Sequence, residues 1–316
     1  MQFFHQGAIC LWVFLLVTGA WSSYGQATNA DYALGIKQYN QEDWSGAITN
    51  FSKAIVAAYD LDQSYSYRAY ARSKLNDSAG ALADCAEFIK LNPKSSGNYF
   101  WRAWIYVNLT NYAAALADYI TAIRLNPRAK DTDLASAIGS ELARQANICF
   151  ATNDLSGAIS NLNVVVFLNP INSFPYLRRA QFKLFQGRYG AAIADADISL
   201  KYDHGYYMAW VVRAWSRVAL NEAHGASEDY DKVNAWLDER LARKKSDPEA
   251  WQEERMLADI LSCLIKGETQ AASEKLENLK KFSLPNGEDK IYTQIYREHW
   301  QKLIETIIAK TKEKKN

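Results

Sequence analysis

The sequence has little proline and glycine, with six and 15 of these residues among 316. Such a composition argues against a disordered or low-complexity chain. Basic and acidic residues nearly balance, at 36 and 35, so a strong electrostatic field for nucleic acid is not indicated. Because 49% of the residues are apolar, the chain can bury a sizeable core, and its length suggests about two domains.

Sequence motifs that carry catalytic chemistry are also missing. The chain has no P-loop, no glycine-rich dinucleotide loop, no GxSxG and no HExxH. Beyond the N-terminal region it holds three histidines, His204, His224 and His299, and none has a metal or nucleophile partner that the sequence reveals. We therefore predict no catalytic residues, no metal and no cofactor. Only a site assembled from distant residues would escape such a search.

Cysteine is scarce as well. Outside the N-terminal region there are Cys85, Cys149 and Cys263, whose spacings match neither a zinc site nor a CxxC motif. Each lies among apolar residues in a helical pattern, so buried free thiols are predicted. One disulfide with an odd cysteine left over is the alternative.

Residues 8–20, AICLWVFLLVTGA, form an uncharged apolar run. The run is shorter than the roughly 20 residues of a membrane-spanning helix and has the length of a secretory signal core. Gly25 and Ala27 supply small residues for cleavage. The sequence therefore predicts a signal peptide over residues 1–27 and an exported protein, periplasmic or secreted. The preceding MQFFHQ contains no lysine or arginine, and the alternative is an uncleaved anchor formed by residues 8–20.

A repeated pattern fills most of the remaining chain. Three segments end in Leu-Asn-Pro, at Pro93, Pro127 and Pro170, as expected of helices that stop before proline. Small residues mark six first helices: Gly35, Ala69, Ala103, Ala146, Ala180 and Ala214. Twelve residues after each, small residues mark six second helices: Ala47, Ala81, Ala115, Ala158, Ala192 and Ala226. Successive copies are 34, 34, 43, 34 and 34 residues apart, which predicts stacked helical hairpins.

This period and these small residues resemble the tetratricopeptide repeat over about residues 29–240. The resemblance implies an all-α fold, a right-handed superhelical solenoid of antiparallel helix hairpins with a concave inner wall. It assigns repeats one to three to residues 28–127 and repeats four to six to residues 140–240. Residues 128–139 are an insertion, either a longer first helix or a hinge. The implied partner is another protein or peptide, with no nucleic acid and no small-molecule cofactor.

In this family the first helices line the concave wall with the residue after the small one and with residues about one turn away. The matching groove residues are Tyr32, Ile36, Tyr70, Lys74, Phe100, Trp104, Asn108, Asn147, Gln181 and Trp215. Aromatic anchors with a polar edge suit protein recognition, although the rings could instead pack between repeats. Family members that clamp a terminal carboxylate need polar residues where this chain has Tyr32 and Ile36, so we exclude that specificity.

An arginine and an aspartate recur at a separation of 16 residues. The predicted structural ion pairs are Arg68 with Asp84, Arg102 with Asp118, Arg179 with Asp195, and Arg213 with Asp229. The two repeats without the arginine, which have Leu34 and Gln145 there, carry Asn50 and Asn161 in place of aspartate. This covariation favours pairing within one hairpin. The alternative is an arginine ladder for an acidic ligand.

The period fails beyond residue 240. Residues 241–284 read as a degenerate helical hairpin that starts near Ser246–Glu249 and breaks at Gly267. Residues 285–316 carry an apolar helical stripe and a basic tail, which predicts a C-terminal capping helix with a solvated end.

The sequence thus predicts a non-enzymatic interaction scaffold or adaptor that binds a peptide or protein segment in its concave groove, in an exported compartment. The alternative is a structural subunit of an envelope or secretory-pathway complex that uses its outer face or its C-terminal helix.

Overall fold

The structure is a computed structural model that describes residues 30–243, 252–282 and 290–313. The predicted signal peptide, the predicted helix start at Ser246–Glu249 and the last residues of the basic tail lie outside the described residues. Every regular element in the described part is a helix, so the fold is an all-α helical repeat.

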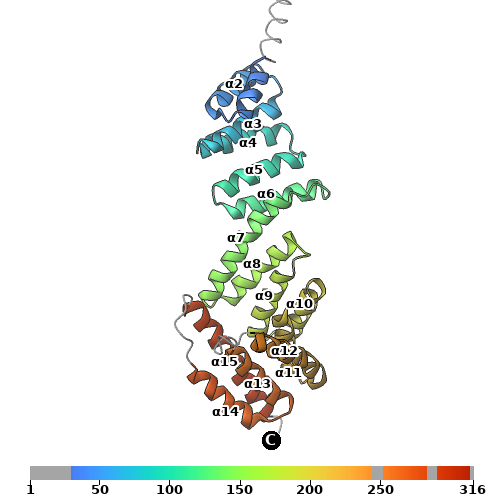
Figure 1. Ribbon diagram of the computed structural model, residues 1–316. Helices are drawn as coiled ribbons and strands as arrows, with labels where there is room; N and C mark the ends of the chain where they lie inside the picture. The colour runs from blue at the N-terminus through green and yellow to red at the C-terminus, as the bar shows by residue number, and fades with distance from the viewer. Residues whose placement is uncertain (1–29, 244–251, 283–289, 314–316) are drawn as a thin grey trace, which may run out of the picture. The chain divides into compact units, whose positions relative to one another are not determined.

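The helices alternate as the first and second members of hairpins (Figure 1). The first helices are residues 30–40, α3 (Leu61–Lys74), α5 (Ser96–Asn108), α7 (Thr132–Ala151), α9 (Ser173–Phe185), α11 (Tyr207–Leu220) and α13 (Gln252–Ile265). The second helices are α2 (Trp44–Val56), α4 (Ser78–Leu91), α6 (Tyr112–Leu125), α8 (Leu155–Leu168), α10 (Tyr189–Tyr202), α12 (Ala223–Arg243) and α14 (Thr269–Lys281). A last helix, α15 (Lys290–Glu313), follows.

Side-chain caps fix where the second helices begin. The carboxylates of Asp43, Asp77 and Asp154 each accept a hydrogen bond from the backbone N–H three residues later, at 2.8–2.9 Å. Asn111 does the same with its amide oxygen for α6. Each cap satisfies one of the free N–H groups at a helix start and stabilises it by about 1 kcal/mol.

The small residues of the repeat allow the helices of each hairpin to approach closely. All six second-helix alanines are fully buried, and the five first-helix alanines are at most 1% exposed. At Gly35 the reason is explicit, because a Cβ atom there would lie 2.9 Å from the Phe51 ring. Alanine tolerates this packing in the other repeats, and larger residues would force the helices apart.

The chain divides into two compact units, one ending at Ile138 and the other starting at Gly139. The boundary falls inside α7, which has 20 residues where α5 and α9 each have 13. The insertion is therefore part of a longer first helix, the first of the two forms that the sequence allowed.

The hairpin of α13 and α14 keeps the turn of the six repeats. In each of the six repeats, the residue five positions before the second-helix alanine has a positive φ, as at Asn76 and Gly187. Gly267 also has a positive φ, and it lies five positions before Ala272 of α14. Glycine adopts this conformation without strain. The degenerate hairpin is thus a seventh copy by backbone conformation.

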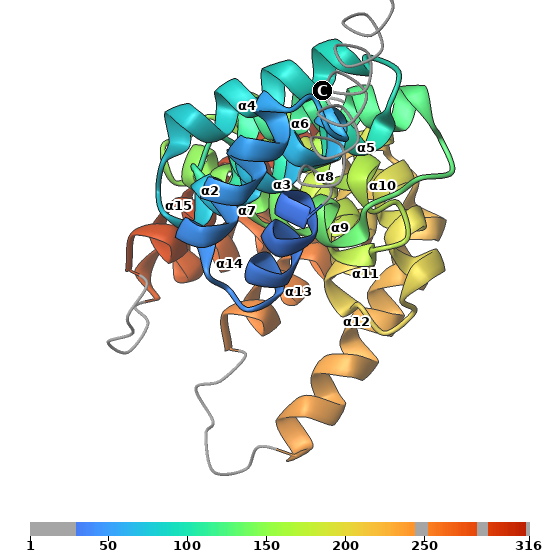
Figure 2. The same cartoon turned by 90° about the horizontal axis from the view of Figure 1, so that it is seen from above.

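The preceding helix, α12, has 21 residues and its last turns extend past α11 (Figure 2).

Candidate functional site

The predicted groove residues of unit 1 lie on three first helices. Their side chains form the unit 1 wall, which we define as Tyr32, Ile36, Tyr70, Lys74, Phe100, Trp104 and Asn108. Lys74 and Asn108 are exposed, and the other five are half-buried. The rings therefore pack partly on neighbouring repeats, as the alternative interpretation had it, and partly face solvent.

Tyr70, in the second repeat, is held by rings from the first and third repeats of unit 1. Its ring lies 5.4 Å from Tyr39, 5.8 Å from Trp44 and 5.5 Å from Trp101, between ring centroids. The ammonium of Lys74 lies 5.0 Å from the Tyr70 ring centroid, in cation–π contact. Burial among these groups raises the pKa of the Tyr39 hydroxyl well above its usual value. The wall at Tyr70 is consequently a rigid aromatic surface.

Trp104 is held by a residue that the sequence analysis missed. Its indole N–H donates to Asp131 Oδ2 at 2.8 Å, and Asp131 Oδ1 accepts from the backbone N–H of Leu134 at 2.9 Å. Asp131 thus caps α7 and fixes the Trp104 ring at the same time. It belongs to the insertion, which the repeat alignment leaves without a role. The sequence could have predicted its capping role, because an aspartate directly before a helix, as Asp131 is before Thr132, is a typical N-cap.

The neighbouring part of the wall is connected to the same carboxylate. Phe100 contacts the Tyr119 ring edge to face, with centroids 5.6 Å apart. Burial raises the pKa of Tyr119, and the charge of Asp131 raises it further. Asp131 therefore binds Trp104 directly, and its charge acts on Tyr119, the ring that Phe100 contacts.

In unit 2 two predicted groove residues are covered, and the prediction that they line an open groove is wrong. Trp215 is fully buried and Gln181 is 3% exposed. The Trp215 ring lies 5.5 Å from Trp300 of α15, and Gln181 Nε2 donates to the hydroxyl of Tyr296 at 3.2 Å. The physical reason is that the apolar stripe of α15 has to be buried, and the first helices α9 and α11 offer the matching surface.

Other contacts fix α15 on this surface. Phe185 of α9 meets three α15 rings, at centroid distances of 5.7 Å to Tyr296, 5.1 Å to His299 and 5.3 Å to Trp300. Asn147 stays exposed, and its side-chain oxygen accepts from Arg178 Nη2 at 3.2 Å. We call Gln181, Phe185 and Trp215 the unit 2 wall, and α15 covers these three residues.

All four predicted ion pairs are present. Each arginine donates from Nε and Nη2 to the two oxygens of its aspartate, at 2.6–2.9 Å, and each aspartate side chain is at most 8% exposed. Such two-point contacts between buried groups fix the geometry of the hairpin, and the arginines are not free for an acidic ligand.

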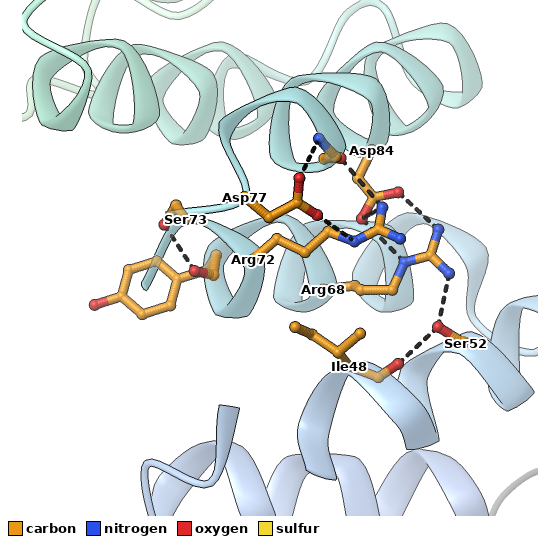
Figure 3. Close-up of polar contacts among 9 residues, drawn as sticks. Ile48, Ser52, Arg68, Arg72, Ser73, Asp77 and Asp84 are labelled. Atoms are coloured by element: carbon orange, nitrogen blue, oxygen red, sulfur yellow. Dashed lines mark hydrogen bonds and ion pairs between the residues drawn. The ribbon is translucent and has the colours of Figure 1, made fainter. Parts of the chain in front are cut away.

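Three of these aspartates have a second cation one helical turn further on. Asp84 also binds Arg72, as Figure 3 shows, at 2.8 Å. Asp195 binds Lys183 at 2.6 Å and Asp229 binds Arg217 at 2.7 Å. In the third repeat the corresponding residue is Tyr106, and among the described residues Asp118 forms an ion pair with Arg102 alone.

Three of the arginines also reach back to the preceding repeat. Arg68 Nη1 donates to Ser52 (Figure 3), Arg179 Nη1 to Asn163 and Arg213 Nη1 to Asp197, each 16 residues earlier. At the equivalent position before Arg102 stands Ala86. The arginines therefore connect neighbouring hairpins, except in the third repeat.

In the two repeats without arginine, the asparagine also bonds within its own hairpin. Asn50 donates to Gln38 at 2.5 Å and Asn161 to the Cys149 sulfur at 3.8 Å, while Gln145 donates to Glu141. In both repeats the partner of the asparagine is thus the residue four positions after Leu34 or Gln145.

A seventh pair was missed because its charges are exchanged. Asp259 occupies the arginine position of the α13–α14 hairpin, and Lys275, 16 residues later, occupies the aspartate position. Their charged atoms lie 3.6 Å apart. Searching for opposite charges at this spacing, in either order, would have found it.

Within the described residues we looked for disulfides, metal-ligand groups and membrane-spanning helices. Cys85, Cys149 and Cys263 are free thiols there, and burial raises the pKa of Cys85. Among described side chains, no group of three or more His, Cys, Asp or Glu could hold a metal ion. In the same part of the chain, no helix combines the length and apolar character that crossing a membrane requires.

Comparisons with known proteins point to one family. Residues 96–128 match the tetratricopeptide repeat family. Human serine/threonine-protein phosphatase 5 is 34% identical over 93 residues, which are 29% of this chain and 19% of the phosphatase. The rat phosphatase matches equally. The match thus spans about a fifth of the length of these relatives.

Solved structures are similar to this chain at low sequence identity. The C-terminal part of a tetratricopeptide repeat-containing protein from Cytophaga hutchinsonii is 16% identical, with 82% of this chain and 97% of that chain covered and a TM-score of 0.42. The yeast Sti1 TPR2AB domain in complex with an Hsp90 peptide is 18% identical, with 77% and 99% covered and a TM-score of 0.35.

The family match, the repeated spacing and the recurring hairpin geometry agree. Tetratricopeptide repeats form a protein–protein interaction scaffold, and the fold is generally not enzymatic. Within an all-α helical repeat fold, this chain thus carries at residues 96–128 a match to the tetratricopeptide repeat family.

Proposed function

We propose that this protein is a non-enzymatic adaptor that binds a segment of another protein on the unit 1 wall. One observation carries the proposal. Trp104 and Trp215 occupy the same position of their repeats, directly after the small residue, yet Trp215 is fully buried and Trp104 is half-buried. Half-exposed aromatic rings held in place are the residues that most often dominate binding energy at interfaces.

The test compares the wild-type chain with a Tyr70→Ala/Trp104→Ala variant in crosslinked affinity purification from the native host. Trp210→Ala is the matched control, because Trp210 is a half-buried tryptophan whose ring faces Lys232 of α12 at 5.8 Å. Circular dichroism establishes that each variant stays helical. Partners lost from the double variant alone support the proposal, and partners retained by it contradict the proposal.

We also propose that the protein works in an exported compartment. The support is the apolar run of residues 8–20 followed by small residues near Ala27. Cell fractionation with N-terminal sequencing of the recovered protein tests this. A chain that starts near residue 28 outside the cytoplasm is the expected result, and an intact N-terminus in a membrane fraction would favour the anchored alternative.

A surface on the other unit favours a second candidate, a structural subunit that binds through its outer surface. Three large apolar side chains are exposed where α8 meets α9: Phe167 at 53%, Ile171 at 71% and Phe174 at 49%. In the two preceding repeats with the Leu-Asn-Pro ending, Lys90 and Arg124 align with Phe167.

A Phe167→Lys/Ile171→Lys variant gives this corner the residue type of the other repeats. Loss of a complex in this variant, with the Tyr70→Ala/Trp104→Ala variant unaffected, would support the second candidate over the first. The C-terminal helix is less suited to this role, because Trp300 and Ile304 of α15 are already buried within unit 2.

A further inference from the structure

The unit 2 wall shows what kind of element the first helices of this chain can hold. Its occupant is an α-helix that contributes Tyr296, His299 and Trp300, residues three and four apart and therefore on one face. The contacts with the wall are mostly between rings, with one hydrogen bond from Gln181 to Tyr296.

The unit 1 wall repeats this arrangement without an occupant from the described part of the chain. Tyr70 follows Ala69 as Gln181 follows Ala180, and Trp104 follows Ala103 as Trp215 follows Ala214. The hairpins are alike, so these residues take the same angular position on their helices. Within the described residues of unit 1, the wall stays half-exposed, and the helix contacts run between members of the hairpin stack.

We propose that the unit 1 wall binds an amphipathic α-helix of a partner protein, with aromatic side chains three and four residues apart on the bound face. The inference rests on the proposed function and specifies the partner segment: it is helical and aromatic, as α15 is on unit 2.

The polar groups of the wall favour a helix over an extended strand. An extended peptide leaves its backbone N–H and C=O groups to be satisfied by the receptor, whereas a helix satisfies its own. The Trp104 indole N–H is already donated to Asp131 at 2.8 Å, and burial raises the pKa of the Tyr32 hydroxyl to about 12. Asn108, at the end of α5, and Lys74, whose ammonium lies against the Tyr70 ring, are the exposed polar residues of the wall. A partner segment would therefore contact mainly the faces of aromatic rings.

The probe for the test is a synthetic peptide of residues 290–313, the sequence of α15, labelled for fluorescence anisotropy and added to the full chain. Two matched peptides accompany it. One replaces Tyr296, His299 and Trp300 by alanine and stays helical. The other keeps all three rings but carries two prolines on the opposite face, which prevent a helix.

The expected result is that the first peptide binds, and that both matched peptides bind at least about tenfold more weakly. Binding should also weaken about tenfold in Trp104→Ala and change less than about twofold in Trp210→Ala. Circular dichroism of the mixture should show an increase in helix beyond the sum of the components, since a free 24-residue peptide is only partly helical.

Each other outcome contradicts the inference. If the proline-containing peptide binds as well as the first, the wall takes extended segments. If no peptide binds, the wall does not select aromatic helices. If binding is lost in Gln181→Ala and not in Trp104→Ala, the peptide has exchanged with α15 on unit 2. In all three cases the affinity purification with the Tyr70→Ala/Trp104→Ala variant still decides the proposed function separately.

Discussion

The two units present the same wall with opposite outcomes. In unit 1, Trp104 is half-buried and its indole is fixed by a neighbouring carboxylate. In unit 2, Trp215 occupies the equivalent position, where it is fully buried and its ring contacts that of Trp300. The repeats themselves hardly differ there, since both tryptophans follow an alanine on a first helix. The fate of a wall residue is therefore set by an element outside the repeat, and a repeat alignment cannot distinguish a binding surface from an interior.

The ion pairs differ in one repeat of unit 1, because Arg68 and Asp84 have the same kinds of additional partners as the pairs of unit 2. Both intact pairs of unit 2 have aspartates with two cations, and their arginines reach the preceding repeat. In unit 1 the pair of Arg102 and Asp118 has neither addition. The third repeat, which carries Trp104, is thus the least cross-connected of the four.

The largest effect that would test this comparison is on stability. Trp300→Ala should lower the unfolding free energy of unit 2 by about 3–5 kcal/mol, because it leaves a cavity against Trp215. Trp104→Ala should cost unit 1 about 1 kcal/mol, since the ring is half-exposed. Hydrogen exchange followed by segment, in urea, measures both units separately. Equal costs would contradict the view that one wall is interior and the other is surface.

The next effect concerns the aspartates. Asp229→Ala leaves Arg213 and Arg217 without their shared carboxylate and should cost about 3–5 kcal/mol. Asp118→Ala leaves only Arg102, whose side chain is 25% exposed, and should cost about 1–3 kcal/mol. The same hydrogen-exchange measurement reports each value, with the asparagine variants as controls for volume. A reversed order would show that the second cation contributes nothing.

A smaller effect should follow from loosening the unit 1 wall. Asp131→Ser keeps a good cap for α7 but is too short to hold the indole as well, so about 1 kcal/mol should be lost. The Trp104 indole N–H should then exchange faster with solvent, as NMR would record. In Trp104→Phe, which has no indole N–H, the Asp131→Ser substitution should have a reduced effect. An unchanged exchange rate in Asp131→Ser would mean that neighbouring rings alone fix Trp104.

The smallest effect is expected from a substitution that gives Arg102 of the third repeat the additional partner that Arg213 has in the sixth. Ala86→Asp places a carboxylate where Asp197 stands relative to Arg213, and Ala86 is exposed. The new partner for Arg102 should stabilise unit 1 by less than about 1 kcal/mol, and the gain should shrink in high salt. Thermal unfolding at low and high salt measures it. The matched control is Arg102→Ala/Ala86→Asp, which should show no gain in stability relative to Arg102→Ala.

Much of the hairpin architecture could be predicted because it depends on short-range, repeated interactions. The alanines at the crossing of two helices, the caps at Asp43 and Asp77, and the bond between Arg68 and Asp84 all join residues within one hairpin. The α13–α14 segment was predicted as a degenerate hairpin, but its ion pair was missed because the charges are exchanged at Asp259 and Lys275 and the period is irregular.

The candidate site was predictable in its positions and not in its accessibility. The resemblance to the family placed Tyr70 and Trp104 on the wall, because each directly follows the small residue of its first helix. The burial of Gln181 and Trp215 was missed, because α15 is far away along the chain. The role of Asp131 was missed as well, since the insertion has no counterpart in the other repeats.

The sequence by itself determined the all-α repeat, the ends of the helices and the partners of the four arginines, because each rests on a fixed spacing along one hairpin. Only the tertiary structure decided which wall stays open. Docking α15 joins residues with no fixed spacing, and its position depends on the total apolar surface that the packed first helices offer.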